Sequence, residues 1–132
     1  MVVDTSAVIA IVANEDRRPE LIDALSEADR RLMSAVNYHE ANVVLLLRFG
    51  AEAHADFDLW LDEAQIEIVP FTRKHAKLAR QAYRRYGKGI GAANLNLADC
   101  AAYALAVDED DALLFVGNDF ARTDVRPALE RF

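Results

Sequence analysis

A chain of 132 residues has room for one domain of ordinary size, and its 53% hydrophobic content is enough to form a core. A single cysteine, Cys100, excludes an internal disulfide, and no apolar run approaches the roughly 20 residues that cross a bilayer, so we expect a cytoplasmic protein. The net charge of −7 argues against a partner of negative charge, but residues 73–88 carry basic residues and no acid.

The pattern of apolar and polar residues predicts strands and helices in alternation. In the first half of the chain we expect a strand at 1–3, a helix from 5 to about 13 capped by Thr5 or Ser6, a helix from Pro19 to about 28, a strand at 31–34, and helices at 36–49 and 51–64. In the second half we expect a strand at 66–69, a helix at 72–86, a glycine-rich loop, a helix at 96–107, a buried strand at 112–116 and an edge strand near Val125.

This order is typical of an α/β domain with a mainly parallel sheet of about four or five strands between two layers of helices. In such sheets the functional crevice lies beyond the carboxyl ends of the strands. Asp4 and Asp119 each follow a predicted strand and are therefore expected at that crevice. The alternatives are a helix cap for Asp4 and an ordinary turn residue for Asp119.

Glu40 and Asp99 stand on predicted helices beside apolar residues. Glu40 shares a helical face with Val43, Val44 and Leu47, so we expect its carboxylate to be partly buried and to need a cation. That cation is either a metal ion or a basic side chain from elsewhere in the fold. Asp99 precedes a similar stripe, and its alternative role is a capping box with Asn96 at the start of the helix.

Four carboxylates in one crevice repel one another and so require cations. Ligands that are all oxygen favour Mg²⁺ or Mn²⁺ over zinc, and His39, His54 and His75 lack a zinc-like spacing. Such a site activates water and stabilises the charge of a phosphodiester during hydrolysis. The pattern does not decide between one ion and two.

The helix predicted at 72–86 has a basic face opposite its apolar stripe. The stripe contains His75 and Tyr83 among its members, and the basic face continues into the glycine-rich loop; its residues are Arg73, Lys77, Arg80, Arg84 and Lys88. A solvated face of mixed charge is the alternative, but this face has no acids with which to form ion pairs. We therefore interpret it as a track for RNA phosphates.

Four segments in this order carry the acids: Asp4-Thr5-Ser6, Glu40 after Ser34-Ala35, Leu95-Asn96-Leu97-Ala98-Asp99-Cys100, and Leu113-Leu114-Phe115-Val116-Gly117-Asn118-Asp119-Phe120. Together they resemble the PIN domain, and more narrowly the VapC toxins of type II toxin–antitoxin systems, from Met1 to about Val125. Ala98 departs from the glycine that is frequent in this family, and Ile90-Gly91-Ala92 departs from a common His-Pro-Ala.

The resemblance implies an endoribonuclease that depends on Mg²⁺ or Mn²⁺, is inhibited by a cognate VapB antitoxin and is commonly a homodimer. It implies that Asp4, Glu40, Asp99 and Asp119 are the metal ligands and catalytic acids, supported through hydrogen bonds by Thr5 or Ser6. The departures leave every acid in place and bear on loop shape.

Two other functions remain open. A receiver-type phosphoacceptor domain also has acids at strand ends and binds Mg²⁺, but it needs a lysine after a late strand, and no lysine follows Lys88. A non-catalytic PIN-like module would act through protein contacts alone.

Overall fold

The computed structural model describes residues 1–91 and 93–129, so Ala92 of the Ile90-Gly91-Ala92 segment lies outside the described residues. Its centre is a sheet of four strands in the order β3-β2-β1-β4, with all neighbouring strands parallel. The strands are β1 (Val2–Val3), β2 (Arg31–Ser34), β3 (Ile66–Val69) and β4 (Leu113–Leu114). The parallel sheet predicted from the sequence is confirmed.

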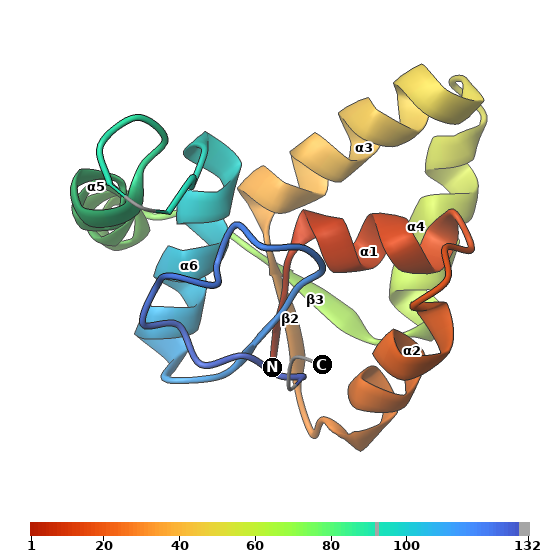
Figure 1. The fold of residues 1–132 in the computed structure, drawn as a ribbon. Coiled ribbons are helices and arrows are strands. Elements are labelled where there is room, and N and C mark those ends of the chain that lie inside the picture. Colours follow the sequence, from red (N-terminus) through yellow and green to blue (C-terminus); the bar gives the residue numbers. More distant parts are fainter. Residues whose placement is uncertain (92, 130–132) are drawn as a thin grey trace.

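In the described part of the chain, six helices cover this sheet on its two sides (Figure 1). They are α1 (Thr5–Val12), α2 (Arg18–Glu27), α3 (Ala35–Phe49), α4 (Ala53–Glu63), α5 (Arg73–Tyr86) and α6 (Leu97–Glu109). The chain is thus an α/β/α sandwich, as expected. Local signals explain several of the helix ends: Thr72 and Asn96 form capping boxes at α5 and α6, and Gly50 ends α3 with φ +90°.

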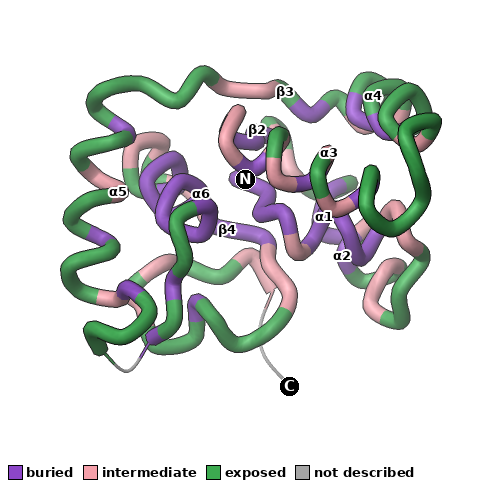
Figure 2. The backbone as a smooth tube through the Cα atoms, turned by 90° about the horizontal axis from the view of Figure 1, so that it is seen from above, coloured by how far each residue is buried: buried purple, intermediate pink, exposed green. Residues whose placement is uncertain are grey.

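Successive strand residues point to opposite sides of the sheet and so divide the core in two. Val3, Met33 and Leu114 pack with α1–α4, whereas Val2, Leu32 and Leu113 pack with α5 and α6. Helix α6 is buried on nearly all sides from Ala98 to Ala106, as the continuous buried stretch in Figure 2 shows. These two cores fix the positions of the helix starts at the carboxyl end of the sheet.

Three predicted boundaries are wrong. The helix predicted at 51–64 begins at Ala53, and the strand predicted at 112–116 is limited to Leu113–Leu114. Within the described residues there is no edge strand near Val125, where the chain forms only an isolated bridge between Leu113 and Pro127. Because proline has no backbone N–H group, a ladder of hydrogen bonds cannot continue through residue 127.

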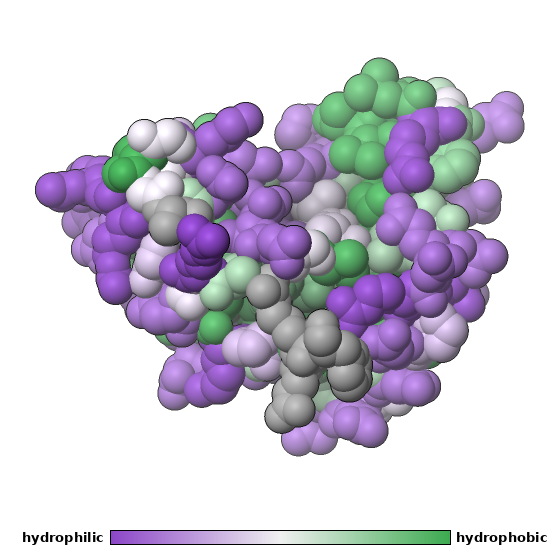
Figure 3. All heavy atoms as spheres, in the orientation of Figure 1, coloured by the Kyte–Doolittle hydropathy of each residue, from purple (hydrophilic) through white to green (hydrophobic). Residues whose placement is uncertain are grey.

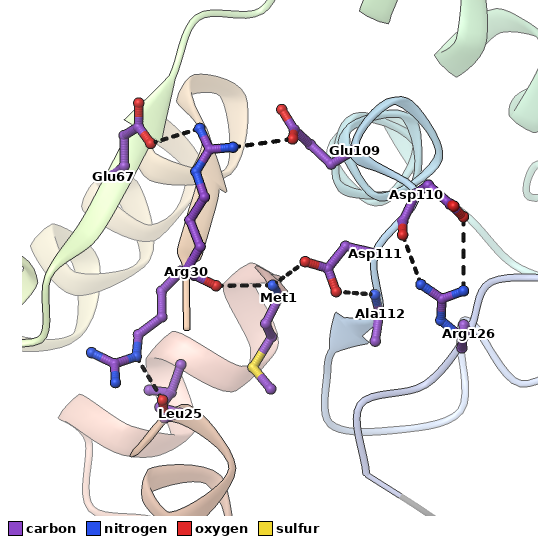
Figure 4. A network of polar contacts seen from close by, with 10 residues as sticks. Met1, Leu25, Arg30, Glu67, Glu109, Asp110, Asp111, Ala112 and Arg126 are labelled. Carbon is purple, nitrogen blue, oxygen red and sulfur yellow. Dashed lines mark hydrogen bonds and ion pairs between the residues drawn. The ribbon is translucent and has the colours of Figure 1, made fainter. Parts of the chain in front are cut away.

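Charged groups at the amino ends of the strands are paired with one another (Figure 4). Arg30 bridges Glu67 of β3 and Glu109 at the end of α6, with N···O distances of 3.1 and 3.3 Å. Arg126 pairs with Asp110, and the amine of Met1 contacts Asp111. The acids at this end of the sheet therefore have cationic partners. None of the described helices combines the length and apolar character that a membrane span requires.

Candidate active site

The four acids singled out in the sequence line one cavity of about 370 Å³ at the carboxyl end of the sheet. They come from four elements: Asp4 after β1, Glu40 on α3, Asp99 on α6 and Asp119 in the segment after β4. The surface is hollowed between the α3 side and the α5 side of the molecule (Figure 3). The fold thus brings together residues up to 115 positions apart in the chain (119 − 4 = 115).

Asp4 is both a helix cap and a wall of the cavity. Its Oδ2 atom accepts hydrogen bonds from the Ser6 backbone N–H at 3.0 Å and from the Ser6 hydroxyl at 2.6 Å. The prediction that Thr5 or Ser6 caps α1 is therefore wrong, since Thr5 is already helical and Asp4 has the extended backbone of a cap. The Oδ1 atom of Asp4 is buried and accepts no hydrogen bond within the described part of the chain.

The buried position of Asp4 raises the pKa of its carboxyl group from 3.8 to about 6, and the negative charge of Glu40 adds to this rise. The hydrogen bonds from Ser6 oppose it. Burial favours the neutral form because the charged form loses its hydration. A cation at the free Oδ1 would reverse this preference.

Asp99 combines the two roles that the sequence left open. Its Oδ2 atom accepts from the Asn96 backbone N–H at 3.0 Å, and Asn96 Oδ1 accepts from the Asp99 N–H at 2.8 Å, which completes a capping box. Burial and then the charges of Asp4, Asp119 and Glu40 raise the pKa of Asp99 from 3.8 to about 7. The electrostatic coupling shows that the four acids share one environment.

Glu40 lines the cavity from α3 and is partly buried, as expected, and so is Val44, but the other two apolar residues expected on its face do not pack in the core. The buried face of α3 consists of Asn37, Ala41 and Leu45, whereas Val43 and Leu47 are 40% and 79% exposed. No arginine or lysine forms an ion pair with Glu40 among the described residues; Arg48 on the same helix pairs with Glu15 instead, at 3.6 Å. Neutralisation by a basic side chain from elsewhere in the fold is thus not observed.

Asp119 is exposed at the mouth of the cavity on a segment that is anchored on both sides. Before it, the Val116 N–H donates to the Ser6 hydroxyl at 3.0 Å, so that Ser6 contacts both Asp4 and the segment after β4. After it, Phe120 is buried and packs on Phe115, with 5.1 Å between the ring centroids. Ser6 thereby connects two of the four acid-bearing segments.

The donor set fits a divalent ion, although the acids do not form a closed cage. Within residues 1–91 and 93–129, no three Asp, Glu, His or Cys side chains lie close enough together to surround an ion. The carboxylates instead repel one another, and the buried Oδ1 of Asp4 lacks a hydrogen bond. The polar side chains that line the cavity within the described residues are carboxylates, hydroxyls and the amide of Asn96, and oxygen ligands of these kinds suit Mg²⁺ and Mn²⁺.

Two residues near the acids were not foreseen. Glu15, just beyond α1, lines the same cavity, and Asn37 is a fully buried polar residue on the core face of α3. The hydroxyl of Thr5 contacts Asn37 and makes no hydrogen bond to an acid. The spacing of Asn37, Ala41 and Leu45 is a signal that could have identified Asn37, had the correct core face of α3 been chosen.

The basic face of α5 is fully solvated. Its five residues are exposed, and none of them forms an ion pair in the described part of the chain: Arg73, Lys77, Arg80, Arg84 and Lys88. The other two basic residues between positions 73 and 88 do form ion pairs: Lys74 pairs with Asp108, and Arg85 pairs with Asp124. The expected core stripe of α5 holds only in part, because Tyr83 is 38% exposed.

Exposed apolar side chains gather on the other side of the cavity, along the second half of α3 (Figure 3). Leu46, Leu47 and Phe49 are 51%, 79% and 57% exposed. Phe49 also borders a second cavity, of about 780 Å³, whose walls come from α1–α4 and include the acids Glu52 and Asp56. A monomer gains nothing from exposing these side chains together, so this surface is suited to contact with another protein.

Comparisons with known proteins show what the whole chain is similar to. Residues 1–126 match the family model described as "PIN domain". The chain is 44% identical to "Ribonuclease VapC28" of Mycobacterium tuberculosis over 132 residues, which is 99% of each chain. In structure it is similar to VapC20 of M. tuberculosis, described as a toxin that cleaves the sarcin–ricin loop, with TM-score 0.77, 16% identity and coverage of 94% and 95%. It is also similar to a chain of a toxin–antitoxin complex from Klebsiella pneumoniae, with TM-score 0.71, 16% identity and 98% of each chain covered.

Proposed function

The chain belongs to the PIN domain family and groups with its VapC members, and on that premise we propose that it is a Mg²⁺- or Mn²⁺-dependent endoribonuclease, the toxin component of a VapBC-type toxin–antitoxin system. The observation that carries this proposal is the shared cavity of Asp4, Glu40, Asp99 and Asp119, where no basic side chain of residues 1–91 or 93–129 forms an ion pair with any of these four acids. The full-length similarity to a protein named as a ribonuclease supports the substrate class. A cytoplasmic location stays a prediction.

In this proposal the four acids hold the ion and are the catalytic residues. When bound, a divalent ion lowers the pKa of water and offsets the charge of the reacting phosphodiester. Asp4 contributes its free Oδ1, while Ser6 keeps the Oδ2 of the same carboxylate in place. Asp99 is likewise held through one oxygen by the Asn96 N–H, which leaves the other oxygen for a ligand. Rigid carboxylates of this kind keep the ligand geometry constant during the reaction.

The RNA backbone binds along the basic face of α5 in this proposal. The exposed side chains of this face lack carboxylate partners within the described residues, so they are available to phosphates. Lys88 stands in the loop between α5 and α6, whose first turn holds Asp99. A strand bound along α5 would therefore be delivered to the acids by way of this loop.

A cognate VapB-type antitoxin is the proposed protein partner. The Klebsiella structure is described as a toxin–antitoxin complex, and the exposed apolar side chains along α3 offer this chain a surface for such a partner. An antitoxin that also inserts a basic side chain among the four acids would neutralise them and exclude substrate. Homodimerisation, implied by the same resemblance, stays a prediction, and this apolar surface is available for it as well.

The receiver-type alternative is set aside, because the chain belongs to a different family. A non-catalytic PIN-like module is the outcome that an activity measurement would reveal. Purified protein is incubated with total RNA with and without Mn²⁺, beside an Asp4→Asn variant as a matched control. Discrete fragments that require both Mn²⁺ and Asp4 support the enzyme. Identical fragments from the Asp4→Asn variant would show that another nuclease made them, and a lack of any cleavage by the wild type would favour the non-catalytic module.

A further inference from the structure

Asn37 lies at the centre of a hydrogen-bond network that joins three helices. It stands in the first turn of α3 and is 0% exposed. Its side-chain Nδ2 donates to the Thr5 hydroxyl at 3.2 Å and to the Ala98 carbonyl oxygen at 3.1 Å. The Thr5 hydroxyl in turn donates to the backbone carbonyl of Asn37 at 3.3 Å. A single buried amide therefore contacts both α1 and α6 from α3.

The chemistry of these contacts fixes the orientation of the Asn37 amide. The Ala98 carbonyl can only accept, and the hydroxyl proton of Thr5 is already donated to the backbone of Asn37. The group that faces both of them must therefore be the NH₂ group, which has two protons to donate. The Oδ1 atom of Asn37 is buried without a hydrogen-bond partner among the described residues. A buried acceptor without a hydrogen bond lowers the free energy of unfolding, so Asn37 is not explained by stability alone.

Each contact of Asn37 lies next to one of the acids. Thr5 follows Asp4 directly, and Ala98 directly precedes Asp99. Glu40 comes one turn after Asn37 on α3. The three acids line one cavity, where like charges repel one another, and a displacement of about 1 Å is enough to spoil the geometry of such a site. The network opposes this displacement by tying the three helix starts together.

We infer that Asn37 is a positioning residue, which holds Asp4, Glu40 and Asp99 in the relative arrangement that a divalent ion requires. The amide contacts neither the ion nor the RNA; it acts through the helix starts that carry the ligands. This inference rests on the proposed function, because it assigns a role to the same acids. It adds that the ion affinity of the site depends on a buried neutral side chain that is not a ligand.

The test compares Asn37→Ala with two variants of the same helix. Leu45→Ala removes a side chain from the same buried face, and Asn42→Ala removes an amide that bonds only within its own helix, to the Tyr38 carbonyl. Binding of Mn²⁺ alone is measured by titration calorimetry, thermal unfolding is followed in EDTA, and RNA binding is measured without divalent ions.

We expect Asn37→Ala to weaken Mn²⁺ binding at least tenfold, with RNA binding through α5 unchanged. Leu45→Ala is expected to lower the melting temperature in EDTA without a comparable loss of Mn²⁺ affinity, and Asn42→Ala to change neither. If Asn37→Ala does not fold, Thr5→Val provides a second test, because it removes the hydroxyl of the network at constant shape and is expected to weaken Mn²⁺ binding in the same direction.

The outcomes separate this inference from the proposed function. A wild type that binds Mn²⁺ and cleaves RNA, together with an Asn37→Ala variant of unchanged Mn²⁺ affinity, overturns the role of Asn37 and leaves the nuclease intact. A wild type that binds Mn²⁺ but cleaves no RNA overturns the nuclease alone. A wild type that binds no Mn²⁺ overturns both.

Discussion

Replacing Asp99 with asparagine should stabilise the protein in the absence of divalent ions. The Asp99 carboxylate is buried beside Asp4, Glu40 and Asp119. Its burial and the negative charges of these three neighbours all disfavour its charged form. Asparagine is neutral at every pH and keeps a side-chain oxygen that can accept from the Asn96 N–H, as Asp99 Oδ2 does. The substitution therefore removes the charge and preserves the capping box.

The magnitude follows from the pKa of Asp99, which rises from 3.8 to about 7 on folding. The native state binds this proton more tightly than the unfolded state, so the free energy of unfolding falls as the pH rises through this interval. At about 1.4 kcal/mol per pKa unit, a rise of about three units costs the ion-free native state about 4 kcal/mol above pH 7. Well below the ordinary pKa of 3.8 the carboxyl group is neutral in both states and the cost disappears.

The assay is urea or thermal unfolding in EDTA between about pH 4 and pH 8. The advantage of Asp99→Asn should be close to zero at the acidic end and reach about 4 kcal/mol at the alkaline end, about 10 °C in melting temperature for a domain of this size. Mn²⁺ should reduce this advantage at pH 8 to about 1.3 kcal/mol, since wild type gains about 2.7 kcal/mol at an ion concentration 100-fold above its Kd. Asp62→Asn on the exposed side of α4 is the matched control and should show no such trend.

A difference between Asp99→Asn and wild type that stays constant with pH would refute this reasoning. So would a variant that is less stable than wild type in EDTA at pH 8. Either result would mean that other groups of the protein offset the negative charge of Asp99. The four acids would then not require an ion to compensate their charges.

Three further predictions concern other parts of the molecule. Arg80→Glu should weaken RNA binding and reduce its salt dependence. Arg17→Glu, at the N-cap position of α2, removes a side chain paired with Glu20 and should change RNA binding less; filter binding at several salt concentrations measures both. Gly117 and Gly50 have φ of +97° and +90°, so replacing either with alanine should lower the free energy of unfolding by about 1 kcal/mol. Gly117 lies two residues before Asp119, so only Gly117→Ala should also weaken Mn²⁺ binding. The side chain of Leu47 is 79% exposed, so Leu47→Asp should leave the melting temperature nearly unchanged. The variant should bind the antitoxin more weakly than wild type in a pull-down. Equal binding would mean that the antitoxin contacts another surface.

Local sequence signals determined most of the element boundaries. The strands at 31–34 and 66–69 have the predicted bounds, α3 and α5 end at the predicted residues 49 and 86, and Asn96 forms the capping box considered from the sequence. These features depend on residues within a few positions of each other, such as a side chain that accepts from an N–H three residues later. The parallel order of the sheet follows from the alternation of strands and helices. Asp4, Asp99 and Asp119 could likewise be proposed from their positions at strand ends and a helix start, whereas Glu40 was proposed from the apolar residues expected on its helical face.

Only the tertiary structure decided which side of α3 faces the core. This helix has apolar residues around most of its circumference, so periodicity alone favoured the side of Val43 and Leu47, both of which are exposed. The buried side was selected by contact with α1 and α6, and it contains a polar residue, Asn37, whose hydrogen bonds come from residues 32 and 61 positions away. Contacts over such distances leave no local pattern, because each partner alone is an ordinary residue of its own helix. The sequence therefore predicts which acids line the site, while the packing of α1, α3 and α6 decides their positions relative to one another.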